Sequence, residues 1–431
     1  MSFFSSPVLK VADFRRLLLS RLFVTFSLQI QAVIVGWQIY QIKPDPLLLG
    51  LIGLTEAIPA ITAAFYSGHV VDTQKPYRVI QWSFIALLVN TLFLLLPMLA
   101  PLVSNSVADD VSSPFSVNIK LFLLFTGIFI SGAARSFISP AYFSLIPQIL
   151  PKAQMSSAAA FNSSTYQFAS VIGPAIGGLI YAVGGPIVAF CAPPLMMILA
   201  LVVAYGFSAE IKNIQNSNQR EPFWQSLTAG LKYTFQHKMM LSTMCLDMFS
   251  VLFGGAVAML PIFADQVFHT GSMGLGILRA APAAGSVLIG GFLAFKPLKS
   301  LSGKLLMAVI VGFGLCTIGF SLSTNIYLSV VLLALSGAFD GVSMVIRGTF
   351  FQAMIPDHMR GRISALNSVF ITSSNEIGSF ESGVAASLMG LVPSVFFGGA
   401  MTLVVVGTVA VLVPGLAKTS VDQEGQLKLG S

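Results

Sequence analysis

Charge is scarce in this sequence. Only 9% of its 431 residues are Asp, Glu, Lys or Arg, whereas 55% are hydrophobic, and a typical soluble domain carries roughly a quarter charged residues. A water-soluble protein cannot place so much apolar surface in its interior and still cover its outside. The shortage of charge therefore excludes an ordinary soluble protein and indicates that lipid is its second solvent.

Cysteine and histidine are also few. The three cysteines, Cys191, Cys245 and Cys316, lie far apart inside apolar segments, with neither the spacing of a metal site nor the pattern of a disulfide framework. We expect them to behave as small buried hydrophobic residues. The four histidines fall at expected helix ends or in loops without ligand spacing, so we expect no metal site and no cofactor.

Signatures of enzyme chemistry are missing as well. The sequence has no glycine–lysine loop of the kind that cradles phosphates, and no paired acid and nucleophile in a loop context. We therefore expect neither ATP hydrolysis nor any other enzymatic activity.

Long hydrophobic runs are abundant. An apolar helix needs about 20 residues to cross the hydrocarbon core of a bilayer, and twelve runs have a suitable length. They are Leu22–Tyr40, Leu47–Val70, Val79–Val103, Ile119–Leu145, Ala158–Val183, Ile187–Phe207, Leu241–Gln266, Met273–Phe295, Leu305–Leu322, Ile326–Phe350, Ile363–Leu391 and Ser394–Val413. The sequence thus predicts an all-α membrane protein with twelve transmembrane helices.

The basic residues are distributed unevenly between the two sides of such a protein. Eighteen lysines and arginines fall on the side that holds both termini, and only Lys43 and Lys120 fall on the other. Basic loops stay in the cytoplasm, so we expect both termini to be cytoplasmic and the protein to lie in a bacterial inner membrane. The net charge of +7 then reflects topology, and no nucleic acid partner is expected.

The two halves of the chain repeat each other. Matching segments occur in the same order at an offset of 205 residues, which chance does not readily produce. The matches are Ser131–Ala133 with Ser336–Ala338, Ala160–Ser163 with Ala365–Ser368, Gly173 with Gly378, and Gly178 with Gly383. We therefore expect two pseudo-symmetric six-helix bundles, residues 1–207 and 239–415. A cytoplasmic linker, 208–238, with a short amphipathic helix around Trp224–Phe235, and a flexible cytoplasmic tail, 416–431, complete the chain.

Two motifs resemble those of the major facilitator superfamily, whose transporters are built from such parallel repeats. The loop from Gly68 through Asp72 to Arg78 resembles the signature between helices two and three, although Thr73 stands where an arginine is usual. The resemblance implies that Gly68, Asp72 and Arg78 form a gating latch. A second string, Gly173-Pro174-Ala175-Ile176-Gly177-Gly178, is similar to the glycine–proline signature of the exporter branch.

Further strings narrow the resemblance. Asp13–Leu17, Leu278–Pro282 and Pro356–Ile363 together resemble the subfamily of bacterial siderophore (enterobactin) exporters and macrolide efflux proteins. The resemblance covers essentially the whole chain. It implies a monomeric secondary transporter that exports a siderophore or a lipophilic drug-like molecule in exchange for protons, by alternating access across the lipid bilayer.

Charged residues occur inside several of the expected helices. A charge at the bilayer centre costs about 2.5–3.5 kcal/mol, so each requires a role. The candidates for substrate contact or proton coupling are Glu56, Arg135, Asp247, Asp340, Arg347, Glu376 and Glu381. Glu56 and Glu376 are favoured for coupling, because a poorly hydrated cavity favours the neutral carboxyl and lets it take up and release a proton in each cycle.

Structural pairing is the alternative role for these charges. Arg135 and Asp340 occupy matching repeat positions with opposite charge, so they form a candidate interhelical ion pair. Asp340 and Arg347 are seven residues apart, hence on nearly the same helix face, and this spacing predicts a shared partner rather than a tight pair. Arg279 and Arg347 are expected toward the cytoplasmic half.

Neutral polar residues add to these candidates. Gln31, Asn162, Gln167 and Asn375 lie within expected helices and are candidates for contact with substrate. Interhelical hydrogen bonding is the alternative for each of them.

Alternative functions remain on the same fold, because fold alone does not settle function. A metal ion or a lysophospholipid is an alternative substrate. A transporter-like sensor that no longer moves a substrate is an alternative of a different class, although the retained Asp72, the Gly173-Pro174 string and the buried acids argue against it.

Overall fold

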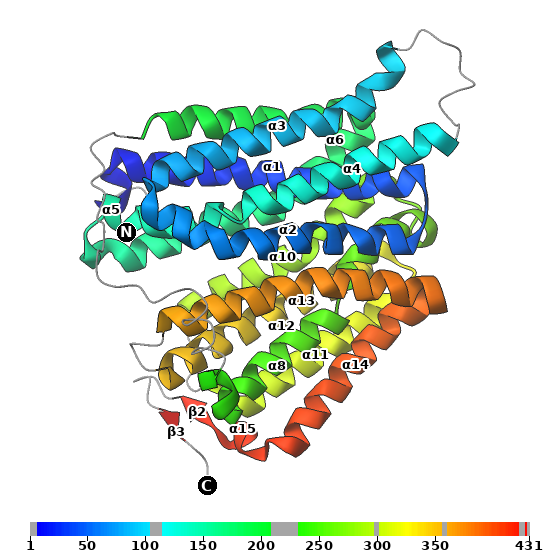
Figure 1. Ribbon diagram of the computed structural model, residues 1–431. Helices are drawn as coiled ribbons and strands as arrows, with labels where there is room; N and C mark the ends of the chain where they lie inside the picture. The colour runs from blue at the N-terminus through cyan, green and yellow to red at the C-terminus, as the bar shows by residue number, and fades with distance from the viewer. Residues whose placement is uncertain are drawn as a thin grey trace. The chain divides into compact units, whose positions relative to one another are not determined.

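The computed structural model describes residues 7–103, 114–207, 232–296, 301–355, 360–421 and 427–428, and nearly all of them are helical (Figure 1). Most of the segment between the predicted spans Val79–Val103 and Ile119–Leu145, and most of the linker at 208–238, lies outside these residues. Within the linker, residues 232–236 are helical. Part of the string Pro356–Ile363 also falls outside the described residues.

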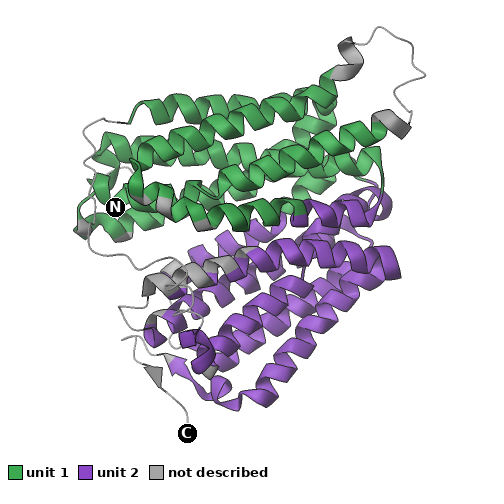
Figure 2. Cartoon of the chain, in the orientation of Figure 1, with its two compact units in different colours: residues 1–44, 55–218, 270–280 green, residues 45–54, 219–269, 281–431 purple. Residues whose placement is uncertain are grey.

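The chain divides into two compact units (Figure 2). Unit 1 comprises Met1–Pro44, Thr55–Asn218 and Thr270–Ala280, and unit 2 comprises Asp45–Leu54, Gln219–His269 and Ala281–Ser431. The division falls inside two helices, α2 (Pro46–Thr73) and α10 (Gly271–Phe295).

Unit 1 is a helical bundle in which α1 packs chiefly against α6. Besides its parts of α2 and α10, it holds η2 (Pro7–Lys10), α1 (Ala12–Ile42), α3 (Pro76–Val103), α4 (Pro114–Arg135), α5 (Ile138–Ile149), η3 (Lys152–Gln154) and α6 (Met155–Tyr205). Its core contains fully buried aromatic side chains such as Phe14, Phe84 and Tyr142.

Unit 2 is a second helical bundle. Its remaining elements are α8 (Lys238–Phe253), η4 (Ala256–Met259), α9 (Leu260–Ile262), the π-helical turn η5 (Phe263–Val267), α11 (Gly303–Leu322), α12 (Ile326–Met354), α13 (Arg360–Met389), α14 (Leu391–Leu412) and α15 (Pro414–Lys418). A small antiparallel sheet of β1 (Leu301–Ser302), β2 (Ser420–Val421) and β3 (Leu427–Lys428), in that order, takes up part of the segment predicted as a tail.

Ten helical stretches among the described residues are long and apolar enough to cross a membrane. One of them, of 49 residues, covers two of the predicted spans, because α6 is interrupted at Gly185 by a positive φ of 71° that glycine adopts without steric cost. The 30-residue α13 corresponds to the predicted span Ile363–Leu391 and is not among the ten. Together with the family shown below, these helices confirm the predicted all-α fold of twelve transmembrane helices.

The surface of the chain has the pattern expected in lipid. Large apolar side chains are strongly exposed along the helices, among them Phe143 at 82% and Phe295 at 94%. In water such exposure across so many helices would promote aggregation, whereas lipid tails solvate these groups. Cys191 is also exposed, so its predicted burial is wrong; Cys245 is half-buried and Cys316 is buried.

The repeated Ser-Gly-Ala motif marks a helix crossing in each unit. A Cβ built on Gly132 of α4 would meet the backbone of Glu56 in α2, and one built on Gly337 of α12 would meet the backbone of Pro282 in α10. Only glycine permits this close approach. The Ser-Gly-Ala motif, which reveals the repeat in the sequence, therefore lies at the crossing of equivalent helices: α2 with α4 in one half and α10 with α12 in the other.

Substitution at these crossings tests the packing. We expect Gly132→Leu and Gly337→Leu each to lower the melting temperature of the purified protein by several degrees, because overpacking costs about 1–3 kcal/mol or more. Gly290→Leu in α10 is the matched control, since a Cβ there meets no atom within 4 Å. Equal melting temperatures for all three variants in a detergent thermal-unfolding assay would contradict the crossing.

Candidate functional site

Unit 2 contains a group of three charged side chains, of which two are buried. Arg347 of α12 forms an ion pair through Nη1 with Asp247 of α8, and its Nη2 lies 3.5 Å from Oδ1 of Asp340, two turns earlier on α12. The side chains of Arg347 and Asp247 are 8% and 11% exposed, whereas that of Asp340 is 41% exposed. One guanidinium thus serves two carboxylates, of which Asp247 is the enclosed one and Asp340 the accessible one.

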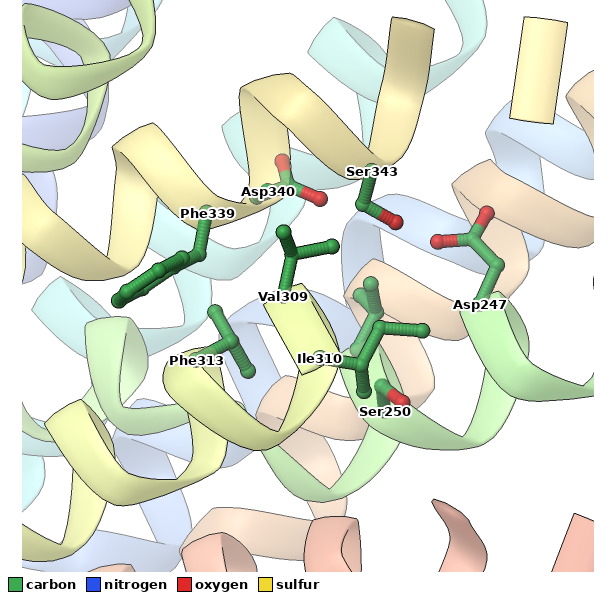
Figure 3. Close-up of a pocket in the computed structure, with 9 residues that line it drawn as sticks. Asp247, Ser250, Val309, Ile310, Phe313, Phe339, Asp340 and Ser343 are labelled. Atoms are coloured by element: carbon green, nitrogen blue, oxygen red, sulfur yellow. The ribbon is translucent and has the colours of Figure 1, made fainter. Parts of the chain in front are cut away.

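A small cavity adjoins the two carboxylates (Figure 3). Asp247 and Ser250 from α8, and Asp340 and Ser343 from α12, lie around it, and apolar side chains of α11 close it. It offers about 20 Å³ to the centre of a water-sized molecule, which is room for roughly one water. The hydroxyl of Ser250 is buried and has no hydrogen-bond partner among the described residues, so the cavity has an unused polar group as well as carboxylates.

Unit 1 contains a second ion pair. Nη1 of Arg135 lies 2.6 Å from Oε1 of Glu56. Arg135 is the last residue of α4, at the break before α5, rather than inside one continuous helix as predicted. The two side chains are 30% and 22% exposed, so this pair is less enclosed than the pair of Arg347 with Asp247.

The structure pairs the charges differently from the predicted Arg135–Asp340 contact. Arg135 forms an ion pair with Glu56 in its own unit, and Asp340 forms one with Arg347. The seven-residue spacing of Asp340 and Arg347 places them on one face of α12, as predicted, and there they contact each other directly.

Arg279 contacts α1. Its Nη1 donates to the backbone carbonyl of Ala32 in α1 at 2.6 Å. It belongs to the first part of α10, which on the predicted topology is the external end of that helix. The predicted topology and the expected location of Arg279 toward the cytoplasmic half therefore disagree with each other, and the membrane side of Arg279 stays a prediction.

The remaining acidic candidates lie on α13. Glu376 and Glu381 are both half-buried. A Cβ built on Gly53 of α2 would lie 2.6 Å from the carbonyl oxygen of Glu376, so α2 approaches the backbone of α13 closely at this residue. Neither glutamate belongs to the group around Arg347.

The neutral polar candidates have separate surroundings. Gln31 is 7% exposed and donates through Nε2 to Oγ of Ser131 at 3.3 Å, which is an interhelical hydrogen bond. Asn375 donates to the carbonyl of Ile371 one turn earlier in its own helix, so it makes no interhelical bond there. Asn162 has a buried Oδ1 without a partner among the described residues, and Gln167 is half-buried.

The latch motif is only partly visible. Gly68 is exposed in α2, and a Cβ built on it meets no described atom within 4 Å. Arg78 is exposed in the first turn of α3. The side chain of Asp72 lies outside the described residues.

The glycine–proline string packs against two neighbours. Cβ atoms built on Gly173 and Gly177 of α6 would lie 2.7 Å from Cβ of Gln29 and 3.2 Å from Cα of Ile30, both in α1. Gly178 instead approaches Gly276 of α10, where the carbonyl of Pro174 also lies close. The string thus lets α6 approach two helices closely rather than one.

The repeat partners of these glycines do the same in unit 2. Gly378 of α13 approaches Leu252 of α8, and Gly383 approaches Gly50 of α2. In both halves the first glycine faces one helix of its unit and the second glycine faces another.

Sequence reasoning missed two residues of the cavity in unit 2. Ser250 follows Asp247 by three positions and Ser343 precedes Arg347 by four, so each shares a helix face with a charged residue. That spacing is the signal that identifies them. The pairing of α8 with α12 has no comparable signal, because it joins residues a hundred positions apart.

Helical bundles with apolar surfaces and charged pairs between their helices are typical of polytopic membrane proteins. The sequence profile of the transmembrane secretion effector family matches residues 4–429. The chain belongs to this family of the major facilitator superfamily, so it is a transporter and not an enzyme.

Curated relatives agree with this assignment. The chain is 26% identical over 386 residues to the MFS-type transporter YjbB of Bacillus subtilis (strain 168), covering 87% of each chain. It is 25% identical over 401 residues to the enterobactin exporter EntS of Shigella boydii serotype 4 (strain Sb227), covering 93% of this chain and 91% of that one.

Solved structures share the fold. A D-xylose–proton symporter matches with a TM-score of 0.68 at 14% identity, covering 92% of this chain and 96% of the other. A bacterial homologue of the iron transporter ferroportin, in an inward-facing state, matches with a TM-score of 0.66 at 16% identity over 94% of this chain and 99% of the other.

Removal of the central guanidinium tests the charged group of unit 2. We expect Arg347→Gln to lower stability by about 3–5 kcal/mol, because it leaves a buried carboxylate without its partner. Thermal unfolding in detergent measures the loss as a drop in melting temperature. Glu56→Gln is the comparison variant and should cost less, since its pair is more exposed.

The double variant Asp247→Asn with Arg347→Gln should recover part of the loss, because it removes both enclosed charges. A melting temperature unchanged by Arg347→Gln, or lowered further in the double variant, would show that the ion pair does not stabilise unit 2.

Proposed function

We propose that the chain is a proton-coupled exporter of a siderophore or a lipophilic drug-like molecule, working by alternating access. Its membership of the secretion effector family and its similarity to an enterobactin exporter support export of a small molecule. The sharing of Arg347 between Asp247 and Asp340 supports coupling to protons, and it is the observation that carries the proposal.

The charge balance of this group explains its suitability. With both carboxylates ionised the group carries one net negative charge, which is costly in an apolar bundle. Uptake of one proton makes the group neutral, and release of the proton restores the charge. The group therefore has two protonation states that differ in their preference for a hydrated or a dry surrounding, as a coupling site requires.

Asp340 is the carboxyl that exchanges the proton in this proposal. It is the more exposed of the two acids and its contact with Arg347 is the longer one. When Asp340 is neutral, Arg347 interacts with Asp247 alone. When Asp340 is ionised, the guanidinium is drawn toward it. Because Asp247 lies on α8 and Asp340 on α12, protonation changes the attraction between these two helices.

Glu56 and Glu376 remain candidates for coupling. Glu56 already has Arg135 as a partner, and this pair provides a separate charged group in unit 1. Glu376 lies where α2 approaches α13. The same experiment compares these residues with Asp340.

The other elements take the roles that the family resemblance implies. The halves 1–207 and 239–415 are the bundles that rock, with 208–238 as the cytoplasmic linker. Asp72 and Arg78 form the latch, and the closely packed glycines of α6 and α13 form the contacts about which helices shift. Both termini are cytoplasmic in the bacterial inner membrane, and the transporter works as a monomer.

Transport in liposomes tests the proposal. The purified protein is reconstituted with a pH-sensitive dye inside and a proton gradient imposed, and siderophores, iron(II) and cationic drugs are added in turn. We expect one compound class to evoke proton flux. Asp340→Asn should reduce that flux at least about tenfold, because an amide cannot take up the proton.

Asp13→Asn is the matched control, since Asp13 pairs with Arg16 at 2.8 Å near the start of α1, away from the group around Arg347, and its loss should leave flux unchanged. Glu56→Gln and Glu376→Gln run in parallel. Flux that survives in Asp340→Asn but disappears in one of these two would move the coupling role to that glutamate.

Flux evoked by iron(II) alone would favour the metal-ion alternative. Binding of a compound with no proton flux in any variant would reject proton-coupled transport in favour of a uniporter or a sensor.

A further inference from the structure

Arg21 stands apart from the other arginines of the membrane spans. It lies in the first half of α1, and its Cζ is 5.1 Å from the ring centre of Tyr142 in α5 and 5.4 Å from that of Tyr166 in α6. Among the described residues it forms no ion pair and no hydrogen bond, and its buried Nε has no partner. The guanidinium is thus held by two aromatic rings of unit 1 and by no acid.

The contrast with other arginines in the spans is clear. Arg135 has Glu56, Arg347 has two aspartates, and Arg279 donates to a backbone carbonyl. A guanidinium carries five N–H donors. Aromatic rings compensate its charge through the π face, but they do not accept all of these hydrogen bonds. An arginine kept partly dry with its donors unused is suited to a ligand that supplies oxygen atoms.

The surroundings of Arg21 are asymmetric. Tyr142 is 1% exposed, and its hydroxyl is fixed by a 2.8 Å hydrogen bond with Oγ of Ser20. Tyr166 is 43% exposed. The site is therefore closed and rigid at Tyr142 and open at Tyr166, so a ligand approaches from the side of Tyr166.

A further unused polar group lies near the open side. Asn162 precedes Tyr166 by one helical turn and so shares its helix face, and its buried Oδ1 has no partner among the described residues. The amide nitrogen of Asn162 is a donor as well. Asn162 thus lies on the same helix face as the ring of Tyr166 that contacts Arg21.

We propose that Arg21, Tyr142 and Tyr166 form a recognition site for the oxyanion of a transported compound, a carboxylate or phosphate attached to a flat apolar body. The planar fork of the guanidinium matches two oxygens of such an anion. The exposed ring of Tyr166 packs against the body. The identity of the ligand as cargo rests on the proposed transport function, whereas anion binding at Arg21 does not.

Small aromatic probes of different charge test the site. Benzoate, phenyl phosphate, benzamide and benzamidine share one ring and differ in charge. The full-length protein in neutral detergent, without any proton gradient, is titrated with each and binding is followed by calorimetry and by the rise in melting temperature. We expect benzoate and phenyl phosphate to bind and to stabilise the protein, and the neutral and cationic probes to bind at least about tenfold more weakly.

Two variants locate the binding. Arg21→Gln should weaken benzoate binding about tenfold or more, since it removes charge-assisted hydrogen bonds. Tyr166→Leu removes the open ring at an exposed position and should weaken it severalfold without unfolding. Arg15→Gln is the matched control, because it removes one positive charge from the start of the same helix, where Arg15 donates to the carbonyl of Leu9.

The results have defined consequences. Equal benzoate affinity in wild type and Arg21→Gln, equal affinity for benzamidine, or no benzoate binding by the wild type would each overturn the proposal. If Arg21→Gln does not fold, Tyr166→Leu decides between loss and retention of binding. Because no gradient is used, failure of binding is separate from failure of proton-coupled transport in liposomes.

A lipid headgroup offers the same oxyanion chemistry. Nanodiscs of phosphatidylglycerol and of phosphatidylcholine distinguish this source, since benzoate should bind equally in both if the site receives cargo. Loss of benzoate binding only in phosphatidylglycerol, restored on transfer to phosphatidylcholine, would assign the site to an anionic lipid and overturn the role in cargo recognition.

Discussion

The absence of water from the bilayer core is the constraint on which the rest of this structure depends. Every backbone N–H and C=O must find its partner inside the protein, and a helix satisfies them within one segment. Lipid tails, however, give helices no hydrophobic reason to associate. Close packing between helices must drive their association instead. The glycines at positions 132, 178, 337 and 383 allow helix backbones to approach nearly to contact. The repeated motifs of the sequence are these contacts.

The same dry environment governs the charges. Ion pairs that would be weak at an aqueous surface become necessary here, because an unpaired charge is expensive. Among the described residues, Arg135 and Arg347 pair with carboxylates, whereas Arg21 lies between tyrosine rings. In the proposed functions, the kind of partner separates the role of Arg347 from that of Arg21. A guanidinium shared by two carboxylates is suited to proton exchange at one of those carboxylates. A guanidinium between two aromatic rings is suited to binding an anion.

Most of the fold could be predicted from the sequence, because hydrophobic runs, basic loops and the offset of 205 residues are properties of the chain itself. The charged group of unit 2 could be predicted only in part. The spacing of Asp340 and Arg347 placed them on one face of α12, yet nothing local indicates that Asp247 lies opposite. Arg135 illustrates the same limit, since a helix break leaves no mark in hydropathy. Nothing local to Arg21 indicates its aromatic partners either, because Tyr142 and Tyr166 lie more than a hundred residues away in the sequence.

The interruption at Gly185 has a consequence for everything that follows it in the chain. A continuous α6 of 51 residues would measure about 76 Å at 1.5 Å per residue, more than twice the roughly 30 Å of the hydrocarbon core. The left-handed backbone at Gly185 instead turns one rod into two crossings of opposite direction. The number of crossings before the second half is then even, and both halves of the repeat begin on the same side of the bilayer. A residue without a side chain thus determines the sidedness of more than half the protein.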